Sequence, residues 1–177
     1  DCPHIPLIGL GAFSRRMHDR AIRERIPLSG SIELTRRCNL RCQHCYLDPV
    51  HDGSRVQKEC STAEIQRFFD QVVDEGTLFM LITGGEPLLR RDFVEIYHYA
   101  LQKGLLVNLF TNGTLISERM ADLLAERPPV MVEITLYGYT QATYERITGA
   151  PGSHARCMAG IERLLERKIP LSLKTML

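Results

Sequence analysis

The chain has 177 residues, of which 44% are hydrophobic and 24% charged, and its formal net charge at pH 7 is +1. A chain of this length can bury one substantial core, so we expect one globular domain. A charge balance this close to zero gives no basic surface for nucleic acid or an anionic membrane, and no apolar run approaches the roughly 20 residues of a membrane span.

Segments with hydrophobic residues at helical spacing alternate with short apolar runs of strand length. Ser61 and Glu64 form a capping-box pattern that opens one helix, and Gly76 and Gly104 end two helices. In chain order the predicted elements are a helix over 14–25, a strand over 31–35, a helix over 61–76, a strand over 78–83, a helix over 93–101, a strand over 105–110, a helix that Ser117 caps, a strand over 130–136, helices over 141–147 and 153–168, and a strand over 171–177.

This alternation predicts right-handed βα crossovers and a parallel sheet, which places the chain in the α/β class. Five strands are predicted, and the last occupies the final seven residues. The run over 78–83 lies between glycines and suits a strand that is buried on both faces. Residues 1–30, rich in Pro, Gly and basic residues, are expected to form a lead-in to a core domain over 31–177.

The spacing of the cysteines bears on the cellular compartment in which the protein works. No basic stretch followed by a long apolar one marks a signal peptide, and the chain opens with Asp1 rather than Met, so we expect a cut or processed product. Of the six cysteines, three lie within the eight residues 38–45. Such crowding is a poor pattern for disulfides between distant parts of a secreted fold and indicates metal binding or catalysis in a reducing cytosol.

Cys38, Cys42 and Cys45 have the spacing CxxxCxxC just after the first predicted strand. A short loop can wrap three thiolates around one inorganic core, and iron–sulfur clusters are held by cysteine thiolates. A cubane cluster has four irons, so three ligands leave one iron open, which is the property that separates a catalytic metal site from a closed structural one.

Other interpretations of the cysteines stay open. A zinc site would need a fourth ligand, for which His44 or His51 is available. Cys60 would complete a four-thiolate cluster of the electron-transfer type. A disulfide would leave one cysteine of the motif unpaired. Outside the motif, Cys157 lies on a helical stripe and is predicted to be a small core residue, whereas Cys2 has no visible partner.

Three further short segments lie at the ends of predicted strands: Gly84-Gly85-Glu86-Pro87 and Thr111-Asn112-Gly113 follow the second and third strands, and the fourth strand ends in Thr135-Leu136-Tyr137-Gly138. With CxxxCxxC and the adjoining Tyr46, they resemble the radical SAM superfamily over roughly residues 31–177. The resemblance implies a partial parallel (β/α)6 TIM-like barrel with about five βα units, truncated before the sixth strand. It also implies that the GGEP turn binds the amino group of S-adenosylmethionine (SAM) and that Tyr46 lies against its adenine; alternatively, Tyr46 is a loop anchor.

All these motifs follow strands, and functional residues of a parallel barrel collect at the C-terminal strand ends. Gly84 and Gly85 let the backbone approach a ligand closely, and Glu86 supplies a carboxylate for an ammonium group. The alternative for this segment is an ordinary turn at a helix start. Asn112 and Thr135 are weaker SAM-contact candidates, because Asn-Gly is a common turn pair and a Thr at a strand end is unremarkable.

Basic residues lie on both sides of the first cysteine. Arg36, Arg37 and Arg41 offer positive charge that would favour thiolates. Alternatively they are ordinary loop arginines. Arg146 and Lys174 could meet a carboxylate of SAM or substrate, but solvated charges are the simpler interpretation for both.

The resemblance also implies the chemistry. SAM would chelate the open iron of a [4Fe–4S] cluster, one electron would cleave it, and the 5′-deoxyadenosyl radical would take a hydrogen atom from substrate. A flavodoxin or ferredoxin would supply the electron. The stretches 110–114 and 144–149, with Gly152-Ser153, are similar to the branch that carries a C-terminal SPASM domain, so a peptide or protein substrate is expected. The alternatives are a catalytically silent peptide-binding module and a simple electron carrier or zinc-stabilised domain.

Overall fold

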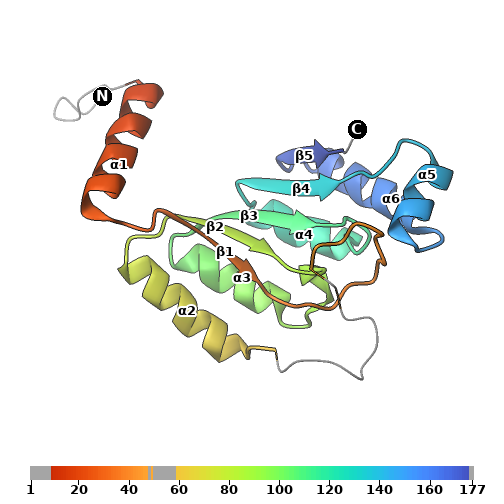
Figure 1. Ribbon diagram of the computed structural model, residues 1–177, viewed down its shortest axis with the longest axis horizontal. Coiled ribbons are helices and arrows are strands. Elements are labelled where there is room, and N and C mark those ends of the chain that lie inside the picture. Colours follow the sequence, from red (N-terminus) through yellow and green to blue (C-terminus); the bar gives the residue numbers. More distant parts are fainter. Residues whose placement is uncertain (1–8, 48, 50–58, 176–177) are drawn as a thin grey trace.

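The computed structural model describes residues 9–47, 49 and 59–175 (Figure 1). Helices and strands alternate along these residues. In chain order they are α1 (Leu10–Glu24), β1 (Ser29–Glu33), α2 (Thr62–Asp74), β2 (Phe79–Thr83), the 3-10 turn η2 (Pro87–Leu89), α3 (Phe93–Gln102), β3 (Leu106–Thr111), α4 (Glu118–Glu126), β4 (Met131–Thr135), α5 (Gln141–Thr148), α6 (Ser153–Glu166) and β5 (Leu171–Lys174).

The strands form one sheet in the order β1-β2-β3-β4-β5, and every neighbouring pair is parallel. The predicted α/β class with a parallel sheet is therefore confirmed. All carboxyl ends of the strands consequently lie at one edge of the sheet, which in Figure 1 also carries the loop after β1 and helix α5. Within the described residues, β1 and β5 are the two edge strands.

The element boundaries differ modestly from the predicted ones. Helix α1 begins at Leu10 rather than at 14, and β1 begins at Ser29 rather than at 31. Strand β5 ends at Lys174 among the described residues; the predicted final residues 176 and 177 lie outside them, as do His51 and Cys2. The predicted capping box is confirmed, because Ser61 N–H donates to the Glu64 carboxylate at 2.8 Å and Glu64 N–H donates to Ser61 Oγ at 3.3 Å.

The hydrophobic core lies between the sheet and helices α2, α3, α4 and α6. Each central strand sends every second residue into it, and these residues are almost fully buried: Met80, Ile82, Val107, Leu109, Val132 and Ile134. The alternate residues are half-buried or exposed. The predicted burial of 78–83 on both faces is therefore wrong, because the described helices of the core cover one face only. Cys157 is completely buried in this core, as predicted.

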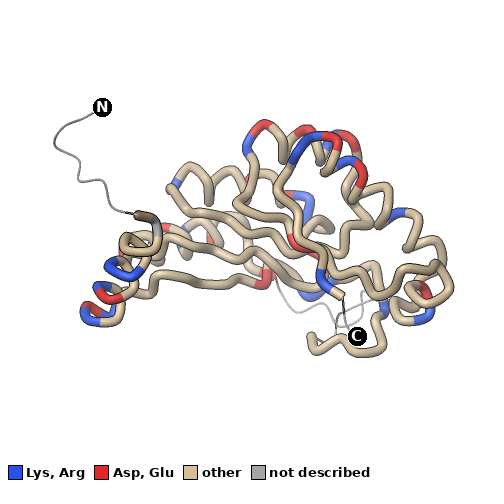
Figure 2. The backbone as a smooth tube through the Cα atoms, turned by 90° about the horizontal axis from the view of Figure 1, so that it is seen from above, with Lys and Arg blue, Asp and Glu red and all other residues tan. Residues whose placement is uncertain are grey.

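Charged residues of both signs alternate along the helices (Figure 2). Helix α6 is tied to α4 by such pairs, in which Arg163 and Arg167 contact Glu118 at 2.6 and 2.8 Å. None of the described helices combines the length and the apolar character that crossing a membrane would require.

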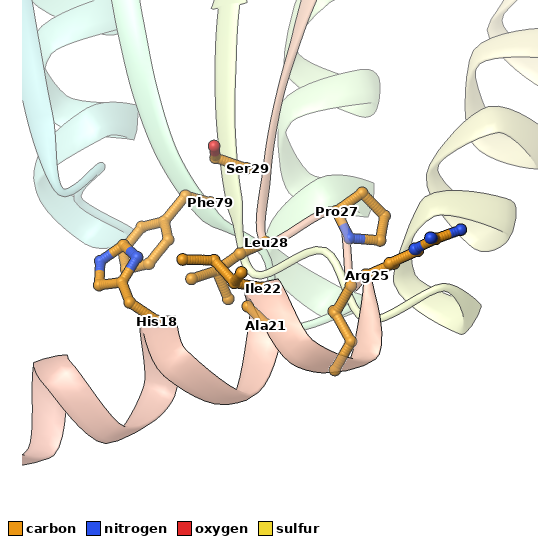
Figure 3. Close-up of a pocket in the computed structure, with 9 residues that line it drawn as sticks. His18, Ala21, Ile22, Arg25, Pro27, Leu28, Ser29 and Phe79 are labelled. Atoms are coloured by element: carbon orange, nitrogen blue, oxygen red, sulfur yellow. The ribbon is translucent and has the colours of Figure 1, made fainter.

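Helix α1 stands at the other end of the sheet from the predicted site. Its last turns and the starts of β1 and β2 line a pocket of about 450 Å³ (Figure 3). The lining includes His18, Ile22, Leu28 and Phe79. This pocket lies at the amino-terminal strand ends, whereas the cysteine motif follows the carboxyl end of β1.

Candidate functional site

The structure brings all four predicted motifs together at the carboxyl edge of the sheet. The cysteine loop follows β1, Gly84 follows β2, Asn112 follows β3, and Thr135 ends β4. Because the strands are parallel and in sequential order, segments separated by up to about a hundred residues in the chain become neighbours here.

The glycine turn braces the cysteine loop. Gly85 N–H donates to Thr35 O at 2.7 Å, and Glu86 N–H donates to Arg37 O at 2.8 Å. A Cβ atom at Gly85 would lie 2.4 Å from Arg37 O, and one at Gly84, whose φ is +146°, would lie 2.5 Å from Thr35 O. The two glycines are therefore required where the turn approaches the backbone that leads into Cys38. Their predicted approach to a ligand stays a prediction.

Glu86 has partners other than the ammonium group that the sequence suggested. Its side chain is fully buried and accepts hydrogen bonds from Thr111 Oγ1 at 2.8 Å, Asn112 N–H at 2.7 Å and Leu88 N–H at 3.1 Å. Burial raises the pKa of this carboxyl group to about 7, although the three hydrogen bonds oppose the shift. The side chain thus joins the turn after β2 to the end of β3, which leaves the turn's backbone as the candidate SAM contact.

Asn112 lies directly beside the first cysteine. Its Nδ2 atom donates to Asn39 Oδ1 at 2.9 Å and is 3.9 Å from Cys38 Sγ. Its Oδ1 atom accepts from the Thr114 hydroxyl at 2.7 Å, and Thr114 in turn accepts from Asn39 Nδ2 at 2.8 Å. This closed set of side chains holds the cysteine loop against the end of β3.

The opposite side of the cysteine loop rests on the end of α5. Arg41 N–H donates to Thr148 O at 2.7 Å, and Gln43 N–H donates to Ile147 O at 3.0 Å. A Cβ atom at Gly149 would lie only 2.9 Å from Arg41 O. In the sequence, the stretch 144–149 stands out only for its resemblance to a branch of the superfamily. In the structure it forms one wall of the cysteine loop, and the glycine turn forms the other. Leu40, with 1% of its surface exposed, anchors the loop between the two walls.

None of the three thiols of the loop forms a disulfide bond. Cys38 and Cys42 are half-buried and Cys45 is exposed. Burial raises the pKa of Cys38, and it raises the pKa of Cys42 to about 11, with a further contribution from the charges of the two neighbouring cysteines. The thiols of Cys38 and Cys42 therefore hold their protons at neutral pH, and metal binding would displace them.

Two of the three arginines near the thiols contact other groups, and the help expected from Arg41 stays a prediction. Arg37 is engaged by Glu59, with Nε and Oε1 2.8 Å apart, and Arg36 donates to Leu47 O at 3.0 Å. Burial is the main cause of the upward pKa shifts of Cys38 and Cys42, and neither arginine is among their main causes. In the folded loop, the guanidinium groups of Arg36 and Arg37 therefore bind oxygen atoms of other residues.

In the part of the chain that the structure describes, no three His, Cys, Asp or Glu side chains are grouped as they would be around one metal ion. The donor set nonetheless fits an iron–sulfur cluster, because cysteine thiolates are its usual ligands and metal binding itself removes the thiol protons. Cys38, Cys42 and Cys45 would hold it. Of the alternative ligands, His44 packs its ring edge-on against Tyr137 at 4.7 Å, and Cys60 is exposed.

Tyr137 is the contact that sequence reasoning missed. Its ring lies edge-on to the His44 ring, with the centroids 4.7 Å apart, and 6.1 Å from the ring of Tyr144, so it packs between the cysteine loop and α5. The sequence offered one signal for this contact, because Tyr137 lies two residues after Thr135 in the same motif. By contrast, Tyr46 is 84% exposed, and Lys174 pairs with Glu133 at 2.5 Å.

Arg90 ties the segments beneath the cysteine loop. It is 6% exposed, donates to Leu34 O at 2.9 Å and to Cys60 O at 3.0 Å, and pairs with the Asp92 carboxylate at 2.6 Å. It therefore connects the end of β1 and the segment before α2 to the start of α3.

The Arg90–Asp92 pair predicts a pH dependence of stability. The hydrogen bond from Arg90 lowers the pKa of Asp92 from 3.8 to about 2. A lowered carboxyl pKa stabilises the fold above the unfolded-state value, and the contribution disappears as the pH falls through the folded-state value. We expect Asp92→Asn to be less stable than the wild type at neutral pH, and the difference to shrink between pH 3.8 and about 2. Urea denaturation across this range measures it, and a pH-independent difference would contradict the assignment.

Comparison with known proteins agrees with this geometry. The family model for the radical SAM superfamily matches residues 32–177. The chain is 35% identical to the AdoMet-dependent heme synthase of Methanosarcina barkeri over 143 residues, which are 81% of this chain and 40% of that protein. It is 34% identical to the PqqA peptide cyclase of Rhizobium meliloti over 147 residues, 83% of this chain and 39% of that protein. The chain thus spans about two-fifths of these relatives.

Solved structures show the same fold. Streptococcus suis SuiB bound to its precursor peptide SuiA matches 98% of this chain and 39% of its own, with a TM-score of 0.72 and 17% identity. Native anSMEcpe with bound AdoMet matches 83% of this chain and 43% of its own, with a TM-score of 0.69 and 22% identity. With the family model covering the chain from β1 to its last residue, the protein belongs to the radical SAM superfamily.

Proposed function

We propose that the chain is the core of a radical SAM enzyme in which Cys38, Cys42 and Cys45 hold a [4Fe–4S] cluster. The observation that carries this proposal is the loop of three cysteines that is clamped between the Gly84–Glu86 turn and the end of α5. When bound, the cluster would pass one electron to SAM and release a 5′-deoxyadenosyl radical that takes a hydrogen atom from substrate.

The chain's own residues would orient the nucleotide. The backbone of the turn at Gly84 and Gly85 is the proposed partner of the SAM amino group, while Thr135 and Asn112 lie at neighbouring strand ends for its polar groups. Tyr46 presents an exposed ring beside the third cysteine that suits stacking on adenine. The clamp on both sides of the loop would keep the thiols in place when substrate binds.

A peptide or protein is the proposed substrate class. Relatives named PqqA peptide cyclase, together with the SuiB structure that contains a precursor peptide, support it. The heme synthase and Fe-coproporphyrin III synthase of Methanosarcina barkeri, 35% and 34% identical, favour a tetrapyrrole as the second candidate. In either case a flavodoxin or ferredoxin would deliver the electron in a reducing cytosol, where thiols stay available for the cluster.

SAM cleavage tests the proposal. The full-length protein, reconstituted anaerobically with iron and sulfide, is expected to form 5′-deoxyadenosine from SAM when dithionite is added, as measured by liquid chromatography. Omission of either SAM or dithionite should abolish the product. A protein that takes up the cluster but never forms 5′-deoxyadenosine would favour an electron carrier, and one that takes up no cluster would favour a silent binding module.

A further inference from the structure

The side-chain amide of Asn112 has a fixed orientation beside Cys38. Its Oδ1 atom accepts hydrogen bonds from the backbone N–H of Thr114 at 3.0 Å and from the Thr114 hydroxyl at 2.7 Å. A backbone N–H can only donate, so the atom of the amide that faces Thr114 must be the oxygen. The Nδ2 atom therefore faces the other way, toward Asn39 Oδ1 at 2.9 Å and Cys38 Sγ at 3.9 Å.

Three side chains form a closed ring of hydrogen bonds around this amide. The Thr114 hydroxyl donates to Asn112 Oδ1, Asn112 Nδ2 donates to Asn39 Oδ1, and Asn39 Nδ2 donates to Thr114 Oγ1 at 2.8 Å. The backbone N–H of Asn112 is bound as well, at 2.7 Å from the buried carboxylate of Glu86. The ring uses one of the two hydrogens on Asn112 Nδ2, which leaves the second for the sulfur of Cys38.

The Cys38 sulfur also has a donor on its own loop. Leu40 N–H donates to Cys38 Sγ at 3.4 Å. A protonated thiol is a weak acceptor, whereas hydrogen bonds to an ionised acceptor are shorter and roughly twice as strong. We therefore expect the 3.9 Å contact from Asn112 to shorten when the sulfur is a metal-bound thiolate.

We infer that Asn112 is a positioning residue that donates a hydrogen bond to the Cys38 sulfur and thereby raises the reduction potential of a cluster bound there. The inference rests on the proposed function. Reduction adds negative charge to a cluster and its thiolates, so a donor at one sulfur stabilises the reduced state more than the oxidised state. A residue that contacts a metal ligand in this way orients the ligand and adjusts the metal.

Asn112→Ala removes the donor. Thr114→Val is the matched control, because it opens the same ring but leaves Asn112 Nδ2 in place, with Oδ1 still held by the Thr114 backbone N–H. Both variants are made in the full-length protein and reconstituted anaerobically without SAM, so that a contact between Asn112 and SAM cannot contribute. At the wild-type midpoint potential, the ratio of reduced to oxidised cluster should fall roughly three- to tenfold in Asn112→Ala, a midpoint shift of up to ~59 mV, and change by less than about twofold in Thr114→Val.

Redox titration followed by electron paramagnetic resonance measures the midpoint potential of the cluster whose signal is missing from Cys42→Ala. Iron analysis and far-UV circular dichroism check that each variant is loaded and folded. Asn112→Asp is a second variant, because it keeps the oxygen that Thr114 binds and replaces the donating nitrogen with another acceptor. Its potential should fall at least as far as that of Asn112→Ala.

A third measurement needs only the wild type and the control. Asparagine labelled with 15N at the side-chain amide should give a nitrogen coupling in electron–nuclear double resonance of the reduced cluster. The coupling should persist in Thr114→Val, because that exchange leaves the amide of Asn112 in place.

The outcomes separate this inference from the proposed function. A fully loaded Asn112→Ala or Asn112→Asp protein with the wild-type potential, or a wild-type cluster without coupling to the labelled nitrogen, would overturn the role of Asn112 and leave the cluster assignment intact. A shift of equal size in Thr114→Val would also overturn it, because the ring would then act only by supporting the loop. A wild-type protein that never assembles a cluster would overturn the proposed function itself.

Discussion

Cys42→Ala is expected to abolish cluster assembly. Under anaerobic reconstitution, the wild type should take up about four irons and four sulfides per chain, and the variant close to none. Cys42 is the proposed middle ligand on a loop that is fixed by hydrogen bonds on both of its sides, so we expect no neighbouring thiol to move into its place. Iron and sulfide analysis with the visible absorption spectrum measures the loss, and circular dichroism confirms that the variant is folded.

Cys60→Ala is the matched control. Cys60 is exposed and contacts Arg90 only through its backbone carbonyl among the described hydrogen bonds, so this exchange should leave both the fold and iron uptake unchanged. Loss of iron in Cys60→Ala would instead support a four-thiolate cluster of the electron-transfer type. Zinc bound in the anaerobic wild type, or full iron uptake in Cys42→Ala, would refute the three-cysteine assignment.

Gly85→Ala is expected to damage the site without touching a cysteine. The added Cβ atom would lie 2.4 Å from Arg37 O, a backbone atom that cannot withdraw without breaking the 2.8 Å hydrogen bond from Glu86 N–H. Overpacking of this kind costs about 1–3 kcal/mol of unfolding free energy. Because Arg37 directly precedes Cys38, displacement of its backbone should also lower iron incorporation several-fold. Urea denaturation and iron analysis measure the two effects.

Gly104→Ala separates the local effect from a general loss of stability. Gly104 has a φ of +83° and nothing within 4 Å of its added Cβ, so the exchange should cost about 1 kcal/mol through backbone conformation alone. It lies between α3 and β3, at the end of the sheet away from the cysteines. We expect normal iron uptake in this variant. Equal losses of iron in both glycine variants would show that the Gly85 turn has no specific role in the loop.

The candidate site is therefore built as a clamp on a short loop. Backbone hydrogen bonds from Gly85 and Glu86 hold one side, and those to Ile147 and Thr148 hold the other. The loop contacts both walls through main-chain hydrogen bonds, and such contacts tolerate changes of side chain well. This construction explains the glycines at 84, 85 and 149, where an added Cβ atom would lie within 3 Å of a backbone oxygen.

Much of the fold followed from the sequence alone. Alternating helical and strand patterns predicted the parallel α/β sheet, and Ser61 with Glu64 predicted the start of α2, because caps and hydrophobic periods act over a few neighbouring residues. The spacing of Cys38, Cys42 and Cys45 likewise needed no tertiary information. These features depend on local chemistry, which the sequence displays directly.

Only the tertiary structure decided which partners the site residues contact. It buried the Glu86 carboxylate against β3, drew Arg37 to Glu59 and brought the Tyr137 ring against His44. None of these choices could be read from spacing, because each depends on the strand order that brings remote segments to one edge of the sheet. In the folded protein, a side chain contacts the partner that burial and geometry bring close to it. The sequence alone offers several partners of the same chemistry and does not choose between them.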